Sequence, residues 1–147
     1  MRTTKVGPLL LLPLLLSLMA ACGEMEPEEV TVDVDTGTQL NLEPAFSSIY
    51  NGFAQSCAFS SCHGEPNPMQ GLSFDEDQES VHAHLLGPSN QQPEYNLVEP
   101  GNSDGSWLVM KLEGTATVGD RMPQGNPLSQ ADIDAVRDWI SAGAALD

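Results

Sequence analysis

The sequence predicts an all-α fold in which about four helices are joined by long loops. Apolar residues recur at helical spacing in four separate segments, and Gly and Pro residues mark the ends of these segments. No segment alternates between apolar and polar residues as a convincing core strand would. A chain of 147 residues has room for one domain with its own core. We therefore expect a single helical domain.

Residues that start and stop helices support this assignment. The last helix is the clearest, because Ser129 and Asp132 form a start that is like a capping box, and Gly143 follows its apolar face. Gly87 and Gly114 end the second and third helical segments. The expected helices span residues 44–55, Ser73 or Asp75 to Leu86, Ser103 or Asp104 to Leu112, and Ser129 to Gly143.

Residues 1–21 predict an export signal. Arg2 and Lys5 precede an apolar stretch over residues 9–18 that is too short to span a bilayer comfortably. Residues 18–22, Leu-Met-Ala-Ala-Cys, resemble a bacterial lipobox, which implies that Cys22 is lipidated and becomes the new N-terminus. The alternative is an ordinary signal peptide that is cut near residue 21 and leaves a free thiol. On the first interpretation the protein is lipid-anchored in the cell envelope, at the outer membrane or at the periplasmic face of the inner membrane.

The chain that follows the signal is very acidic. Residues 22–43 are rich in Glu, Asp, Thr and Pro, which favours a flexible acidic tether ahead of a domain over residues 44–147. Only Lys111, Arg121 and Arg137 remain against 21 acidic residues. This charge excludes nucleic acid as an expected partner, and it would attract partner proteins with basic docking surfaces. Simple solubility explains the same charge, and both interpretations stay open.

The pattern Cys57-x4-Cys62-His63 predicts a binding site for haem c. Two cysteines followed at once by a histidine are typical of covalent attachment, in which the thiolates add to the haem vinyl groups and the imidazole binds the iron. The more common pattern has two residues between the cysteines instead of four. A Cys57–Cys62 disulfide is one alternative in an oxidising compartment. A structural zinc site is another, although it needs four ligands and no second cysteine pair follows.

With these residues placed, the region from about 44 to 145 resembles a single-haem class I cytochrome c domain. It is more closely similar to cytochrome c-like lipoproteins of myxobacteria and planctomycetes. The resemblance implies that loops wrap around one haem, that the first and last helices cross near the haem edge, and that the iron carries one electron. The segments that carry it are the first helix with Cys57–Gly64, Gly71–Phe74, Val98–Asn102, Ser106–Leu112, Arg121–Pro123, Leu128–Ser129 and Trp139–Ala144.

The same resemblance implies that Met122 is the second axial ligand of the iron. This family places its methionine ligand in a Met-Pro loop before the last helix, and a thioether ligand raises the reduction potential. Met69, Met110, His82 and His84 are the alternatives. The two histidines lie two residues apart on a helix, so they do not share a face, and we expect them to be ordinary surface residues. We expect Trp107 and Trp139 to pack against the haem.

These observations predict an electron carrier in the bacterial envelope, not an enzyme. The sequence contains no recognisable nucleophile elbow and no buried pair of carboxylates for acid–base chemistry. The alternative is a haemless envelope lipoprotein with a Cys57–Cys62 disulfide and an interaction or structural role. A third interpretation is a subunit through which electrons enter a larger oxidoreductase.

Overall fold

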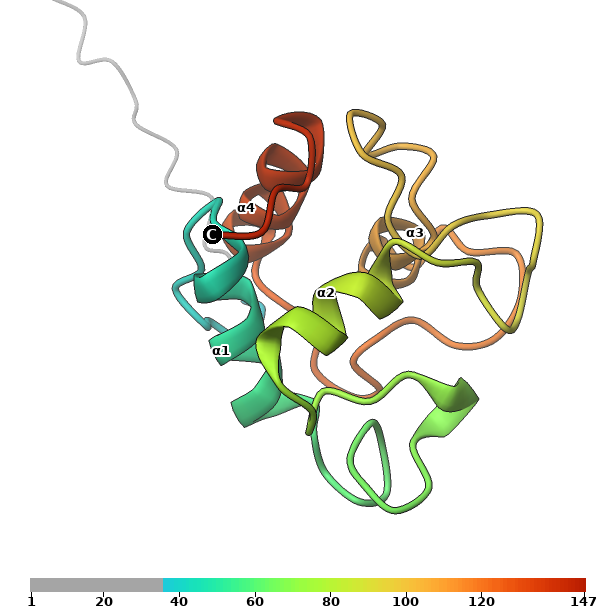
Figure 1. Ribbon diagram of the computed structural model, residues 1–147. Coiled ribbons are helices and arrows are strands. Elements are labelled where there is room, and N and C mark those ends of the chain that lie inside the picture. Colours follow the sequence, from blue (N-terminus) through green and yellow to red (C-terminus); the bar gives the residue numbers. More distant parts are fainter. Residues whose placement is uncertain (1–35) are drawn as a thin grey trace, which may run out of the picture. The chain divides into compact units, whose positions relative to one another are not determined.

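The computed structural model describes residues 36–147 and contains four α-helices (Figure 1). The predicted export signal, Cys22 and most of the predicted tether lie outside the described residues. Within residues 36–147 there is no β-strand, which confirms a mostly helical fold for this part of the chain. The helices are α1 (Phe46–Ser56), α2 (Gln78–Leu85), α3 (Trp107–Glu113) and α4 (Gln130–Ser141), with one 3-10 turn at Met69–Gly71 between α1 and α2.

Helices α1, α2 and α4 meet around one aromatic cluster. The rings of Phe46 and Trp139 stack with centroids 5.2 Å apart, and the His82 ring meets the edge of Phe46 at 4.8 Å. The His82 Nε2 atom also lies 2.8 Å from the carbonyl oxygen of Ala144. The prediction that His82 is a plain surface residue is therefore wrong, since its ring joins three helices.

The N-terminal part of the described chain is held by a buried carboxylate. The amides of Leu40 and Leu42 donate to the two carboxylate oxygens of Asp132, at 2.7 and 2.8 Å, and the Ser129 hydroxyl donates to the same group at 2.6 Å. Asp132 is only 2 % exposed. Residues 38–42, which we expected in the flexible tether, therefore pack against the domain, and Leu42 belongs to its core.

The helix starts partly follow the sequence predictions. Ser129 caps α4 as predicted, because its hydroxyl accepts from the Asp132 amide at 3.1 Å. At α2 the capping residue is Asp77, whose carboxylate accepts from the Ser80 amide at 3.0 Å. The predicted start at Ser73 or Asp75 is wrong, because residues 72–74 are buried against the core before the helix begins.

The start of α3 also lies later than predicted. Ser106 precedes the helix, but its hydroxyl accepts from the Glu99 amide and donates to the Asn102 carbonyl, so it stabilises the preceding loop. Gly114 ends α3 in the left-handed conformation, with φ at +77°, which confirms the predicted stop. The loop residue Asp104 pairs with α4 instead of capping α3.

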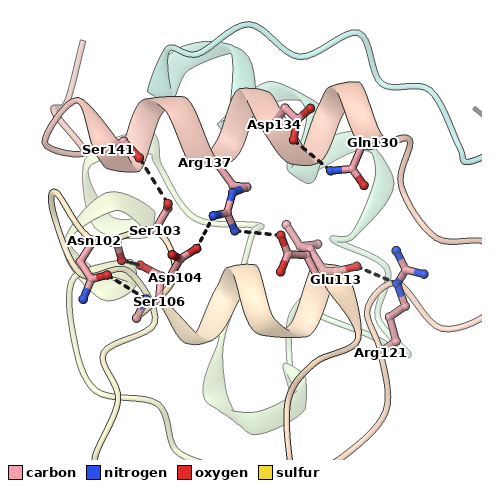
Figure 2. Close-up of polar contacts among 12 residues, drawn as sticks. Asn102, Ser103, Asp104, Ser106, Glu113, Arg121, Gln130, Asp134, Arg137 and Ser141 are labelled. Carbon is pink, nitrogen blue, oxygen red and sulfur yellow. Dashed lines mark hydrogen bonds and ion pairs between the residues drawn. The ribbon is translucent and has the colours of Figure 1, made fainter.

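An arginine on α4 links that helix to α3 (Figure 2). The Arg137 guanidinium donates to the Glu113 carboxylate at 2.8 Å and to the Asp104 carboxylate. The hydrogen bond to Asp104 is the main cause that raises the pKa of Arg137 above its ordinary value. These two ion pairs connect α4 to the end of α3 and to the loop that precedes α3.

Candidate cofactor site

A cavity of about 460 Å³ is lined by residues of α1, α2 and α3 and of the three segments that connect the helices. All four haem-site residues that the sequence predicts border this one cavity: Cys57, Cys62, His63 and Met122. The first three follow α1, in the loop drawn in green in Figure 1, and Met122 lies in the orange loop before α4. The fold therefore brings together two segments that are about sixty residues apart in the sequence.

The cysteine loop is held by backbone hydrogen bonds to its own residues. The Cys57 amide continues α1 by donating to the Phe53 carbonyl at 2.7 Å, and the His63 amide returns to the Cys57 carbonyl at 3.1 Å. The Gly64 amide donates to the Phe59 carbonyl at 3.0 Å. A Cβ atom at Gly64 would lie 2.4 Å from the Ala58 carbonyl oxygen, so this tight turn requires glycine. The four residues between the cysteines thus form a closed loop that brings His63 back beside Cys57.

His63 is half-buried, and the hydrogen bond of its ring defines which nitrogen is basic. Its Nδ1 atom lies 2.9 Å from the Leu72 carbonyl oxygen, which can only accept a hydrogen bond. The proton of the neutral ring is therefore on Nδ1, and Nε2 carries the lone pair. The ring also meets the edge of Phe74, with centroids 5.6 Å apart. A histidine oriented in this way by its second nitrogen is suited to bind a metal through the first.

Met122 is half-buried and is fixed by α3. Its amide donates to the Lys111 carbonyl at 2.8 Å, and the neighbouring Arg121 Nε donates to the Leu112 carbonyl at 2.7 Å. Both bonds tie the loop to the last turn of α3. The thioether side chain is thereby held at the cavity wall, where it can act as a soft ligand.

The two thiols are free in this structure and differ in environment. Cys57 is half-buried, and its burial is the main cause that raises its pKa to about 11, with a smaller contribution from Cys62. Cys62 is exposed, and its sulfur lies 3.7 Å from the Ser61 hydroxyl oxygen. At neutral pH Cys57 is therefore a protonated thiol in apolar surroundings.

The alternative iron ligands divide into two groups. Met69 and His84 border the cavity, so both stay possible ligands on position alone. Met110 packs against the core, and His82 belongs to the aromatic cluster, and neither borders the cavity. The wall of the cavity includes the buried apolar side chains of Leu72, Phe74 and Trp107.

The two tryptophans have different places in the fold. Trp107 borders the cavity, as expected of a residue that packs against a cofactor. Trp139 does not, although we expected it to do so. The first and last helices do meet, through Phe46 and Trp139, but this contact does not border the cavity.

Lys111 also belongs to this site, although the sequence patterns did not predict it there. Its side chain is 6 % exposed and borders the cavity. Burial lowers its pKa, and the charge of Asp120 partly opposes this shift. The sequence did contain a signal, because Lys111 follows Trp107 by four residues and therefore lies on the same face of α3.

No family model, no curated protein and no solved structure matches the chain. In residues 36–147, no group of three or more His, Cys, Asp and Glu side chains could hold a metal ion. None of the helices in this part of the chain is long and apolar enough to cross a membrane.

Proposed function

We propose that the helical domain, including residues 38–42 that pack against it, is cytochrome c-like, binds one haem c and carries one electron at a time. The observation that carries this proposal is that Cys57, Cys62, His63 and Met122 all border the same cavity. These are two thiols for covalent attachment, one imidazole and one thioether, which is the donor set of a c-type haem with His/Met ligation. The cavity volume of about 460 Å³ lies within the range of roughly 300–1,000 Å³ that is usual for cofactor sites.

The residues around the cavity supply the conditions for electron transfer. The Leu72 carbonyl holds the His63 ring so that Nε2 is available as a ligand. The Lys111 carbonyl holds the Met122 backbone on another part of the wall. The buried apolar side chains of Leu72, Phe74 and Trp107 line the cavity and would keep water away from the haem. The haem would supply a one-electron Fe(III)/Fe(II) couple.

The proposal extends to the location and the partners of the protein. Lipidation at Cys22 would anchor the domain in the bacterial envelope, and the acidic surface would attract redox partners that carry basic docking surfaces. The domain would be a carrier and not an enzyme by itself. The alternative is a haemless lipoprotein in which Cys57 and Cys62 form a disulfide, and a third role is an electron-entry subunit of a larger oxidoreductase.

The deciding experiment is to express the full chain in a bacterial host that matures c-type cytochromes with four residues between the cysteines. The reduced-minus-oxidised spectrum and the alkaline pyridine spectrum of the denatured protein are then recorded. A thioether-type haem spectrum that stays with the denatured chain supports the carrier. A colourless protein with a disulfide contradicts it and favours the haemless alternative. A large partner that co-purifies stoichiometrically with the coloured chain would favour the subunit role.

A further inference from the structure

A positive charge lies in the wall of the cavity. The Lys111 ammonium donates to the Val118 carbonyl at 3.2 Å and lies 6.0 Å from the centre of the Trp107 ring. An ammonium has three N–H donors, so one carbonyl leaves donors for a further acceptor. A buried charge is costly unless it is paired, and the side chain is only 6 % exposed. Lys111 is therefore suited to hold an anion inside the cavity.

A second donor approaches the same place. A Cβ atom at Gly119 would lie 2.8 Å from the Gln91 Nε2 atom and 2.9 Å from the Lys111 Nζ atom. Gly119 has φ at +72°, so a side chain is disfavoured there by its conformation as well as by space. The two nitrogens are close enough to share one acceptor, and Gln91 also borders the cavity.

The other basic residues of the described chain have different roles. Arg137 is paired with Glu113 and Asp104, and Arg121 donates to the Leu112 carbonyl. Neither borders the cavity, so Lys111 is the sole Lys or Arg among residues 36–147 that does. A haem carries two propionate carboxylates, and a cavity wall with one cation can neutralise one of them.

We propose that the side chains of Lys111 and Gln91 form a binding site for a carboxylate in the cavity wall, and that one haem propionate occupies this site. This inference rests on the proposed haem function. A charge-assisted hydrogen bond from the ammonium would provide most of the binding, and the Gln91 amide would orient the second oxygen. The competing acceptor is Asp120, which borders the same cavity and belongs to the same loop as Gly119. The test has to distinguish these two carboxylates.

The test uses the full-length, haem-loaded protein and two variants, Lys111→Met and Gln91→Leu. Resonance Raman spectra report the propionate bending bands, and a redox titration reports the midpoint potential. Lys111→Met should shift a propionate band and lower the potential, because loss of a nearby positive charge favours ferric iron. Gln91→Leu should shift the same band with a smaller change in potential, since it removes no charge.

Asn51→Asp is the matched control, because it makes the same change in net charge at an exposed residue of α1 that does not border the cavity. It should leave the propionate bands unchanged. The inference would be overturned if the propionate bands are unchanged in both Lys111→Met and Gln91→Leu. If Lys111→Met lowers the midpoint potential without shifting a propionate band, Lys111 pairs with Asp120 instead. If Lys111→Met does not fold, Gln91→Leu decides alone. The pyridine spectrum of the unmodified protein separates this result from failure of the haem proposal, because the inference can fail while the haem is present.

Discussion

The helical side and the cavity side of this domain are built in different ways. On the helical side, α1, α2 and α4 bury apolar residues almost completely, and Ile49 and Ile140 are both 0 % exposed. The cavity side consists largely of loops. Two of its apolar residues at the border of the cavity, Phe59 and Met69, are 58 % and 52 % exposed. The helical side is filled by the chain's own side chains, whereas the cavity side surrounds space that a cofactor can occupy.

On the proposed function, this difference separates the residues that make the domain fold from the residues that hold the haem. The packing of the helical side stabilises the fold through burial, at about 25 cal/mol for each Å² of apolar surface removed from water. The cavity side is held mainly by backbone hydrogen bonds, such as those from His63 to Cys57 and from Met122 to Lys111. Substitutions on the helical side should therefore reduce stability, and those on the cavity side should change cofactor binding and reduction potential.

The largest effect should come from removing both thiols with Cys57→Ser and Cys62→Ser. We expect complete loss of covalent haem, because no thioether can form, while the helices of the domain remain. The alkaline pyridine spectrum of the denatured protein measures the first effect, and far-ultraviolet circular dichroism measures the second. Haem that stays with the denatured double variant would show that attachment does not use these residues.

On the helical side, Asp132→Ala should reduce the free energy of unfolding by about 3 kcal/mol, because it leaves the amides of Leu40 and Leu42 without their acceptor. Urea titration of the haem-free protein measures this change. Asp134→Ala is the control, since Asp134 is exposed on the same helix and pairs with Gln130. It should cost less than about 0.5 kcal/mol. Equal losses in the two variants would contradict the role assigned to the buried carboxylate.

The Asp132 network also shows where prediction from sequence stops. Local signals located all four helices, and they placed Ser129 at the start of α4. The hydrogen bonds from Leu40 and Leu42 to Asp132 connect residues 92 and 90 positions apart, and no local pattern encodes such a contact. For this reason the sequence predicted that the tether continues to residue 43, although the chain already packs against the domain at Leu40 and Leu42.

The candidate site shows the same limit. Cys57, Cys62 and His63 follow from a short pattern, and Met122 followed from a resemblance, so each was predictable as a candidate. Their arrangement around one cavity depends on how two distant loops pack, which the sequence pattern does not encode. Lys111 was missed because one charge within an apolar helix face is most often solvent-exposed through its long side chain.

On the cavity side, Met122→Ala should keep the haem and lower its midpoint potential by on the order of 0.1 V, a fraction of the roughly 0.8 V that axial ligands span. The thioether stabilises ferrous iron, so its loss favours the ferric state. Met69→Ala is the matched control, because Met69 also borders the cavity but is 52 % exposed. An unchanged potential in Met122→Ala with a lowered one in Met69→Ala would assign the ligand to Met69.

A smaller effect should distinguish the two thiols in the reduced, haem-free protein. The pKa of Cys57 is raised from 9.0 to about 11, so at pH 8 its thiolate is about 100-fold scarcer than that of an ordinary cysteine. Cys62 should therefore react with iodoacetamide much faster than Cys57, as measured by mass spectrometry. In denaturant the two rates should become equal. Equal rates in the folded protein would contradict the burial of Cys57.

The raised pKa of Cys57 also predicts how stability depends on pH. Because the unfolded chain releases the thiol proton first, the haem-free protein should lose about 2 kcal/mol as pH rises from 9 to about 11. This stabilising contribution is fully present below pH 9. The haem-loaded protein should lack the loss, since a thioether has no proton to release. Urea titrations of both forms across this range provide the measurement.

The smallest effect concerns the ion pair that joins the two sides through α3 and α4. Glu113→Gln should reduce the free energy of unfolding by about 0.5–1 kcal/mol, and Asp104→Asn should have less effect, because its side chain is 83 % exposed whereas that of Glu113 is 29 % exposed. A double-mutant cycle with Arg137→Met measures each coupling. Neither substitution should change the midpoint potential, because neither acidic residue borders the cavity. A potential that follows the loss of stability would show that α4 controls the position of the α3 cavity wall, and the two sides of the domain would then be coupled.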